Sequence, residues 1–190
     1  MMILSECWRY IKSDAYRYFG KCGFFDIISL CASNRFFRFC LYFRLSKSNN
    51  LFIRIPSSLF KAWLGSRVNI QISSKVPIGY GLFIPHGNVV VNSTATIGDN
   101  FTMCQFSSIG SVKGNAASIG SNVYVAPNVS IVEDVIISDN VVIGAGSVVV
   151  KNIETSSIVC GVPSRKVNTL AQDKVEYYIY NFFNVDGFNG

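Results

Sequence analysis

The feature that most constrains this chain is a six-residue repeat of apolar side chains that begins at Ile72. Thirteen aliphatic or methionine positions fall on three uninterrupted runs of this period: Ile72, Ile78, Ile84; Val91, Ile97, Met103, Ile109; and Ile119, Val125, Ile131, Ile137, Ile143, Val149. The following residue is often small, which lets a short strand turn a tight corner. One hexad cannot bury its apolar face alone, so neighbouring coils must stack around a shared core. The repeat therefore predicts a parallel β-helix of about four triangular coils.

The repeat is interrupted twice. Ile84 and Val91 are seven residues apart, so one extra residue bulges around the sequence Pro-His-Gly at 85–87. Ile109 and Ile119 are ten apart, so four extra residues leave the coil near 111–114. Insertions in solenoids form loops on one face, often the binding face. The single histidine of the chain, His86, lies in the first of these insertions.

The first 70 residues have a different character from the repeat. They carry 11 Lys and Arg against 3 Asp and Glu, and 15 of the 26 aromatic residues. Apolar spacing predicts helices over 5–20, 24–32, 34–46 and 56–64. We interpret this region as a small helical bundle with an aromatic core, with contact to an anionic membrane surface as a secondary role. Nucleic acid is not expected as a partner, because no recognised nucleic-acid motif accompanies the charge.

Several classes of protein are disfavoured by what the sequence lacks. The mean hydropathy of +0.33 raises the question of a membrane protein, but no apolar stretch of spanning length and no signal peptide is recognisable. The six cysteines form no zinc-binding spacing, and we interpret them as reduced thiols of a cytoplasmic protein. One histidine cannot supply a three-histidine zinc site, so no metal is predicted.

The motifs ISSKVPIGYGLFIPHG (72–87), STATIGDN (93–100), IGAGSVVVKN (143–152) and CGVPSRKV (160–167) resemble those of the hexapeptide-repeat acyltransferases, in their serine acetyltransferase-like branch. SDAYRYFG (13–20) more loosely resembles the front of members that acetylate sugars of capsule and O-antigen. The resemblance implies a left-handed β-helix, a homotrimer with sites between subunits, and acetyl-CoA as the acetyl donor. It also implies that His86 is the general base, a task that suits an imidazole because its pKa lies near neutrality.

The same resemblance assigns residues to the coenzyme. Gly144, Ala145 and Gly146 match the small residues whose amides line the pantetheine groove. Lys151 and Arg165 match basic positions near the nucleotide phosphates. Tyr124 stands where some relatives place a tryptophan against the coenzyme. IGAGS is also simply another hexad, and Arg165 also fits a solvated tail. Cys104 follows the anchor Met103 at a position for small residues, which favours packing over nucleophilic chemistry.

Several positions depart from the serine acetyltransferase pattern, and they indicate the class of acceptor. Gln71 stands where an aspartate orients the histidine, and Pro85 stands where an acidic residue holds the amino acid. Asn88, two residues beyond His86, completes the set of positions expected to face the acceptor. A site without these carboxylates is poorly matched to the ammonium group of serine. We therefore expect an uncharged sugar hydroxyl of a surface polysaccharide, or of its lipid-linked precursor at the inner membrane, as the acceptor.

The sequence leaves two alternatives open: serine O-acetyltransferase of cysteine synthesis, and a β-helix that binds or assembles without catalysis. All three interpretations share one predicted fold class, which is mainly β: a left-handed parallel β-helix preceded by a small α-helical region. The predicted boundaries are 1–70 for the helical region, 71–167 for the β-helix domain and 168–190 for a C-terminal tail.

Overall fold

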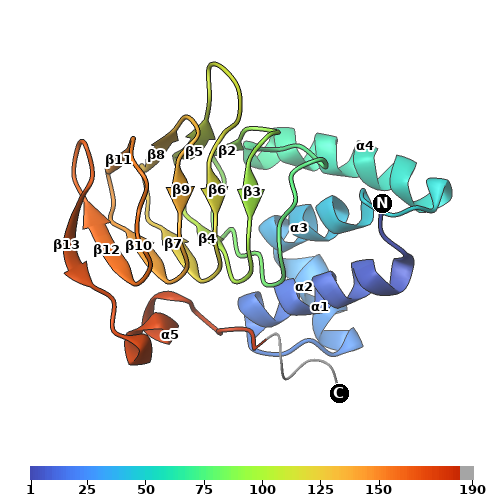
Figure 1. Ribbon diagram of the computed structural model, residues 1–190. Helices are drawn as coiled ribbons and strands as arrows, with labels where there is room; N and C mark the ends of the chain where they lie inside the picture. The colour runs from blue at the N-terminus through green and yellow to red at the C-terminus, as the bar shows by residue number, and fades with distance from the viewer. Residues whose placement is uncertain (185–190) are drawn as a thin grey trace.

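The computed structural model describes residues 1–184 as a parallel β-solenoid with four helices packed against its first coil (Figure 1). The parallel strands are β1 (Ile70–Ile72), β2 (Val89–Val91), β3 (Thr96–Ile97), β4 (Thr102–Met103), β5 (Ser107–Gly110), β6 (Ser118–Ile119), β7 (Val123–Val125), β8 (Ser130–Val132), β9 (Ile136–Ile137), β10 (Val141–Ile143), β11 (Val148–Val149) and β12 (Ser157–Cys160). They form three sheets along the solenoid, one of which has the order β1-β2-β5-β8-β11. This architecture is consistent with the predicted left-handed β-helix of hexapeptide repeats.

The core follows the predicted repeat. All thirteen anchors are buried, each at 6% exposure or less, and they form one continuous apolar cluster along the solenoid. In-register pairs such as Ile109 with Ile131 stack identical or similar side chains on successive coils. The hexad periodicity therefore predicts which side chains point inward.

The number of coils differs from the prediction, since the sheet containing β1 has five strands. The last coil runs from Val149 through Ile153 to Val159, and its first step is four residues instead of six. Ile153 still pairs with Ile137 of the coil before. A shortened corner keeps the stack in register, so period counting alone stops one coil early.

The corners use asparagine where the backbone turns left-handed. Asn100, Asn122 and Asn140 have φ of 52°, 58° and 57°, and asparagine tolerates this conformation better than most residues. Their amides form a ladder: Asn100 Nδ2 donates to Asn122 Oδ1 at 3.1 Å, and Asn122 Nδ2 to Asn140 Oδ1 at 2.9 Å. The ladder ties three coils together at one edge of the triangle.

The second insertion is the loop that protrudes from the solenoid between β5 and β6 (Figure 1). Its base is held by Glu133, which accepts hydrogen bonds from the Ser111 hydroxyl at 2.9 Å and the Val112 amide at 3.2 Å. These bonds lower the pKa of Glu133. The side chain of Val112 is 86% exposed.

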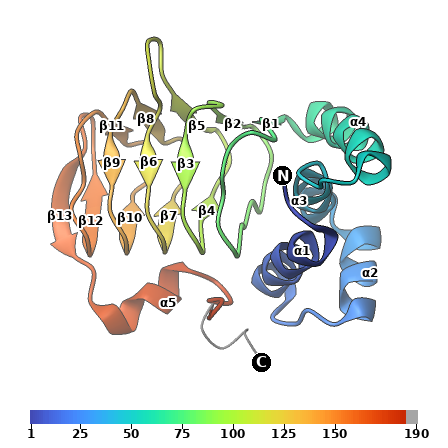
Figure 2. The same ribbon diagram turned by 45° about the vertical axis from the view of Figure 1, so that its right-hand side comes forward.

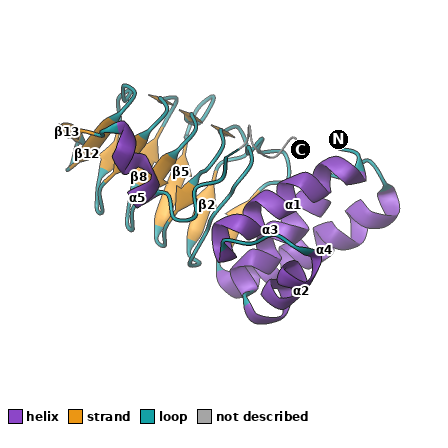
Figure 3. Cartoon of the chain, turned by 90° about the horizontal axis from the view of Figure 1, so that it is seen from below, coloured by secondary structure: helices purple, strands orange, loops and turns teal. Residues whose placement is uncertain are grey.

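The helical region consists of α1 (Leu4–Phe19), α2 (Phe24–Ser33), α3 (Arg35–Leu45) and α4 (Leu51–Val68), which gather at one end of the solenoid (Figures 2 and 3). Asn34 caps α3 as predicted, accepting from the amides of Phe36 and Phe37. α4 begins earlier than predicted because Asn50 caps it, and Pro56 lies inside the helix instead of at its start. Within residues 1–184, no helix has both the length and the hydropathy needed to cross a bilayer.

The helices cover the open edge of the first coil with polar side chains. Arg44 of α3 forms a buried bidentate pair with Asp14 of α1, at 2.8 and 2.9 Å, and donates to the carbonyls of Ile78 and Gly79. Asp14 in turn accepts from the Leu82 amide at 2.8 Å. These side chains form hydrogen bonds with backbone groups of the first coil that a preceding coil would otherwise have bonded.

After β12 the chain reverses into β13 (Arg165–Thr169), which pairs antiparallel with β12. It continues through a 3-10 turn, η1 (Gln172–Lys174), and α5 (Val175–Tyr178), and returns toward the helices (Figure 1). There Arg17 donates to the Tyr180 carbonyl at 2.8 Å, and Asn100 Nδ2 to the Phe183 carbonyl at 2.9 Å. The part of the predicted tail from 185 to 190 lies outside the described residues.

Candidate active site

The predicted general base lies on an exposed turn between the first and second coils. His86 is exposed, while its neighbour Gly87 is buried against the C-terminal end of α4. A Cβ on Gly87 would sit 1.8 Å from the Val68 carbonyl oxygen, so only glycine permits this approach. Directly after it, the Asn88 amide donates to the same carbonyl at 3.3 Å, and the Val89 amide to the Asn69 carbonyl at 2.9 Å.

Helices α1 and α3 contact the same turn from the other side. The Tyr18 hydroxyl donates to the Ile84 carbonyl at 2.7 Å and accepts from the Ile84 amide at 3.1 Å. The Phe36 ring meets the His86 imidazole edge-on, with ring centroids 6.2 Å apart. The helical region thus fixes the turn that carries the histidine and leaves the imidazole facing outward.

The residues predicted to face the acceptor do not form one cluster. Gln71 points outward from β1 into a groove of about 360 Å³ beside α4, also lined by Lys61 and Ser66. Within the described chain Gln71 makes no hydrogen bond to His86. Asn88 is occupied with Asn69, whose Nδ2 donates to its Oδ1 at 3.1 Å, a contact between two left-handed turn residues.

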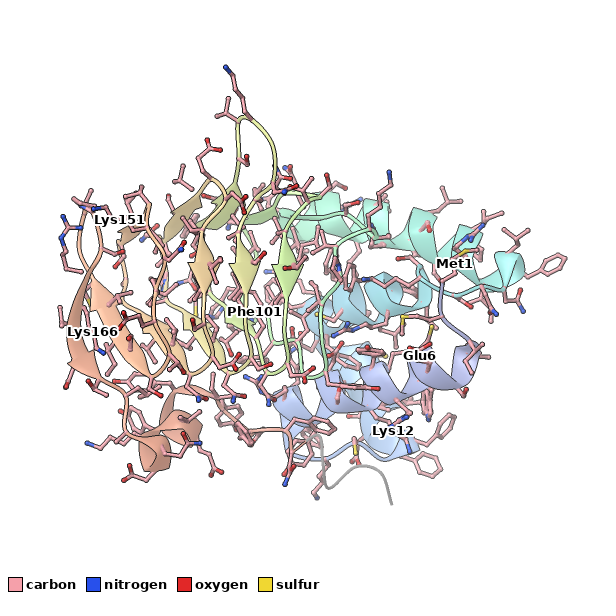
Figure 4. The ribbon with its side chains drawn as sticks, viewed as in Figure 1. Met1, Glu6, Lys12, Phe101, Lys151 and Lys166 are labelled. Carbon is pink, nitrogen blue, oxygen red and sulfur yellow. The ribbon has the colours of Figure 1, made fainter. Side chains whose placement is uncertain are left out.

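At the far end of the solenoid, the two predicted phosphate-binding cations come together. Lys151 and Arg165 line one cavity of about 390 Å³, together with Lys166 and Ser164. Figure 4 shows Lys151 and Lys166 at the end opposite the helices. Lys166 was not predicted, although its place beside Arg165 in the SRKV segment was a signal that could have included it. Three exposed cations around one cavity can attract phosphate groups.

The small-residue run lies on the turn from β10 to β11. Ala145 and Gly146 are exposed, and Gly146 has φ of 71° with open space where a side chain would be. Gly144 is constrained from inside the molecule, since a Cβ there would lie 2.3 Å from the Cys160 sulfur. Gly144 is therefore required for the packing of two coils, while the next two residues, Ala145 and Gly146, expose their backbone to solvent.

Tyr124 does not line the cavity that contains the three cations. It is on β7, packed with Tyr178 of α5 at 6.1 Å between ring centroids, beneath the C-terminal segment. Its hydroxyl is 3.6 Å from the Cys104 sulfur, and burial raises the pKa of Tyr124 to about 12. Burial also raises the pKa of the Cys104 thiol, which keeps it protonated and supports the predicted packing role.

His86 precedes β2 and Lys151 of the cation cavity follows β11, so the two residues lie at opposite ends of two strands of one sheet. Those strands are three positions apart in the order β2-β5-β8-β11, which corresponds to roughly 14 Å at the usual spacing of neighbouring strands. No cluster of three potential metal ligands occurs among residues 1–184.

Comparison with known proteins supports the hexapeptide-repeat class. The family described as "Bacterial transferase hexapeptide (six repeats)" matches residues 116–151. A serine acetyltransferase of Staphylococcus aureus is 38% identical over 103 residues, which cover 52% of this chain and 48% of the relative. A serine acetyltransferase of Staphylococcus epidermidis is 40% identical over 119 residues, covering 60% and 54%. The chain thus spans about half the length of these relatives.

Solved structures agree in fold over more of the chain. The serine acetyltransferase of Neisseria gonorrhoeae superposes with a TM-score of 0.73 at 25% identity, covering 90% of this chain and 68% of that one. The soybean enzyme complexed with serine gives a TM-score of 0.64 at 25% identity, covering 83% and 67%. The Brucella abortus enzyme in complex with coenzyme A gives 0.68 at 21% identity, covering 88% and 68%, which bears on the fold alone.

These comparisons contradict the predicted sugar acceptor. The relatives are named serine acetyltransferases, and no polysaccharide-modifying branch is supported. The prediction relied on missing carboxylates at Gln71 and Pro85. Two missing groups on one chain do not determine an acceptor, because an exposed histidine can be completed by groups from other elements or another subunit. The coarser prediction, similarity to the hexapeptide-repeat acyltransferases, agrees with the family match over residues 116–151 and with these relatives.

Proposed function

We propose that the protein transfers an acetyl group from acetyl-CoA to the hydroxyl of serine. The observation that carries the proposal is the only histidine of the chain, exposed on a turn that three helices and a buried glycine hold in place. The similarity to serine acetyltransferases supplies the acceptor and the donor.

The proposed reaction is a direct transfer. A neutral nitrogen of His86 removes the hydroxyl proton of serine while the oxygen attacks the thioester carbonyl carbon. The tetrahedral intermediate collapses with cleavage of the carbon–sulfur bond, and the imidazolium returns the proton to the departing thiolate. O-acetylserine and coenzyme A are the products, and no acyl-enzyme forms.

The coenzyme would extend along the solenoid between the two regions described above. Lys151, Arg165 and Lys166 would hold its phosphates by direct charge attraction at the far end. The exposed backbone at Ala145 and Gly146 would allow the pantetheine arm to approach closely. The acetyl group would then lie toward His86.

Assembly into a homotrimer is part of the proposal. The outward face of α4 is strongly apolar for a surface helix, with Phe52 at 92% exposure, Leu59 at 68% and Trp63 at 57%. Such a face favours burial in an assembly. Light scattering of the purified protein gives its mass, and a monomer at micromolar concentration would contradict this part of the proposal.

Peripheral membrane contact through residues 1–70 remains a prediction, with less charge available for it than the sequence implied. Arg17 and Arg44 are buried, and Lys47 and Lys61 donate to carbonyls of the first coil. Binding to anionic vesicles that weakens with added salt would support it, and binding equal to that of neutral vesicles would not.

The direct test is release of the coenzyme A thiol from acetyl-CoA with serine as acceptor. We expect turnover in the wild type and a loss of about 10²–10⁴-fold in His86→Ala, the usual contribution of a general base. Lys113→Ala, in the protruding loop, is the control and should turn over normally. If the protein binds acetyl-CoA but no hydroxyl acceptor causes release of the coenzyme A thiol, a non-catalytic module is favoured instead.

A further inference from the structure

The hydroxyl of Tyr18 replaces a missing strand beside the histidine turn. In a parallel ladder, each strand bonds to the strands on both sides, but the first coil has no coil before it. Phe83 bonds onward to the second coil through the Phe101 carbonyl at 2.9 Å and the Met103 amide at 3.1 Å. The next residue, Ile84, faces the open edge, where the Tyr18 hydroxyl bonds both its carbonyl and its amide.

This contact is the last backbone anchor before His86. Within the described chain, residues 85–87 form no backbone hydrogen bond, and the ladder resumes at Asn88 on the Val68 carbonyl. The turn therefore spans from one fixed point on α1 to another at the end of α4. If the first point is lost, the peptide that carries the imidazole gains freedom on one side.

The environment of Tyr18 suits an anchor. Its ring packs edge-on against Phe37 and Phe83, at 5.5 and 4.7 Å between centroids, and its hydroxyl lies 3.6 Å from the Cys40 sulfur. Burial raises the pKa of Tyr18 well above its ordinary value, so the hydroxyl stays protonated and able to donate. The ring contacts would persist in phenylalanine, which isolates the role of the oxygen.

We propose that Tyr18 is a positioning residue for His86: its hydroxyl fixes Ile84 and thereby sets the direction in which the imidazole faces the acceptor. The catalytic consequence rests on the proposed function, whereas the effect on the imidazole itself does not. A reactive group displaced by about 1 Å loses much of its rate advantage.

Because His86 is the only histidine, its imidazole gives a single set of side-chain NMR signals. In Tyr18→Phe we expect the Cε1–H resonance to shift or broaden. Tyr42→Phe is the matched control, since Tyr42 stacks on Phe60 and its hydroxyl makes no hydrogen bond within residues 1–184. An imidazole signal in Tyr18→Phe that coincides with that of the wild type would overturn the proposal.

Kinetics separate positioning from general destabilisation. We expect kcat of Tyr18→Phe to fall about 10-fold while KM for acetyl-CoA stays within about 2-fold, and no further loss when the change is added to His86→Ala. Equal losses in both backgrounds would contradict the proposal. If the wild type does not acetylate serine, the proposed function fails and the NMR experiment still decides the role of Tyr18.

If Tyr18→Phe does not fold, hydrogen exchange in the wild type provides the test. The Ile84 amide should be protected as strongly as that of Phe83, its strand neighbour. Exchange of the Ile84 amide at the rate of an unprotected residue would overturn the proposal.

Discussion

The two ends of the solenoid use positive charge in opposite ways. At the helical end, Arg17 and Arg44 are at 0% and 1% exposure, and their donors bond to a carboxylate, a hydroxyl and backbone carbonyls. At the other end, Lys151, Arg165 and Lys166 are exposed around a cavity. The first set closes an edge of the fold, whereas the second remains available to an anionic ligand.

The net charge of a segment therefore does not indicate whether its charged groups are available to a ligand. The basic front of the chain suggested an anionic partner, yet its two most buried arginines complete the first coil. The nearly neutral body contains the cations best placed for phosphate.

Removing one buried charge at the helical end should strongly destabilise the folded protein. Arg44→Met leaves Asp14 buried without its partner, and we expect the free energy of unfolding to fall by about 3–5 kcal/mol. Urea denaturation measures the change. Arg44→Met combined with Asp14→Leu should recover part of the loss, and a single variant as stable as the wild type would refute the importance of the pair.

At the other end, the turn beside the cavity is limited by packing. Gly144→Ala places a methyl group against the Cys160 sulfur, and we expect a loss of about 1–3 kcal/mol from overpacking. Adding Cys160→Ala removes the sulfur and should restore most of the stability. Thermal denaturation of both variants compares them, and an unrescued double variant would show that the strain lies elsewhere.

Removing exposed cations should change binding and leave folding intact. For Lys151→Ala and Arg165→Ala we expect affinity for coenzyme A to fall about 10-fold each, with stability within about 0.5 kcal/mol of the wild type. Isothermal calorimetry measures the affinity. Lys174→Ala, on η1 outside the cavity, is the control. Unchanged affinity in both cavity variants would show that this cavity does not bind coenzyme A.

The last prediction concerns the dependence of stability on pH. Burial lowers the pKa of Lys47 to about 8, from about 10.5 in the unfolded chain. Between these values the unfolded state holds more protons, so this lysine makes stability rise with pH from about 8 to 10. Lys47→Met should rise less over that window than the wild type when urea midpoints are compared. Parallel curves would show that Lys47 titrates normally.

Much of the fold was predictable because one pattern determined it. The hexad anchors identified the core, and the capping residue Asn34 marked the start of α3. The fifth coil was missed because its corner after Val149 is shorter than the period. Packing against existing coils, which a local pattern does not contain, keeps that coil in register.

The site was less predictable because its residues depend on long-range contacts. The break in the repeat singled out His86, but nothing local indicated that Tyr18 bonds to Ile84, 66 positions away. Tyr124 was matched by position alone, and the returning C-terminal segment covers its face of the sheet. The predicted sugar acceptor is wrong because it was inferred only from carboxylates that are missing at two positions.

The return of the chain to its starting end changes how this repeat protein should unfold. Solenoids usually behave as one-dimensional stacks whose terminal repeats fray first. Here the segment after β13 reaches Arg17 and Asn100, so the last coil and the helices share contacts. Loosening either end disturbs the other, which joins a linear array into a single cooperative unit.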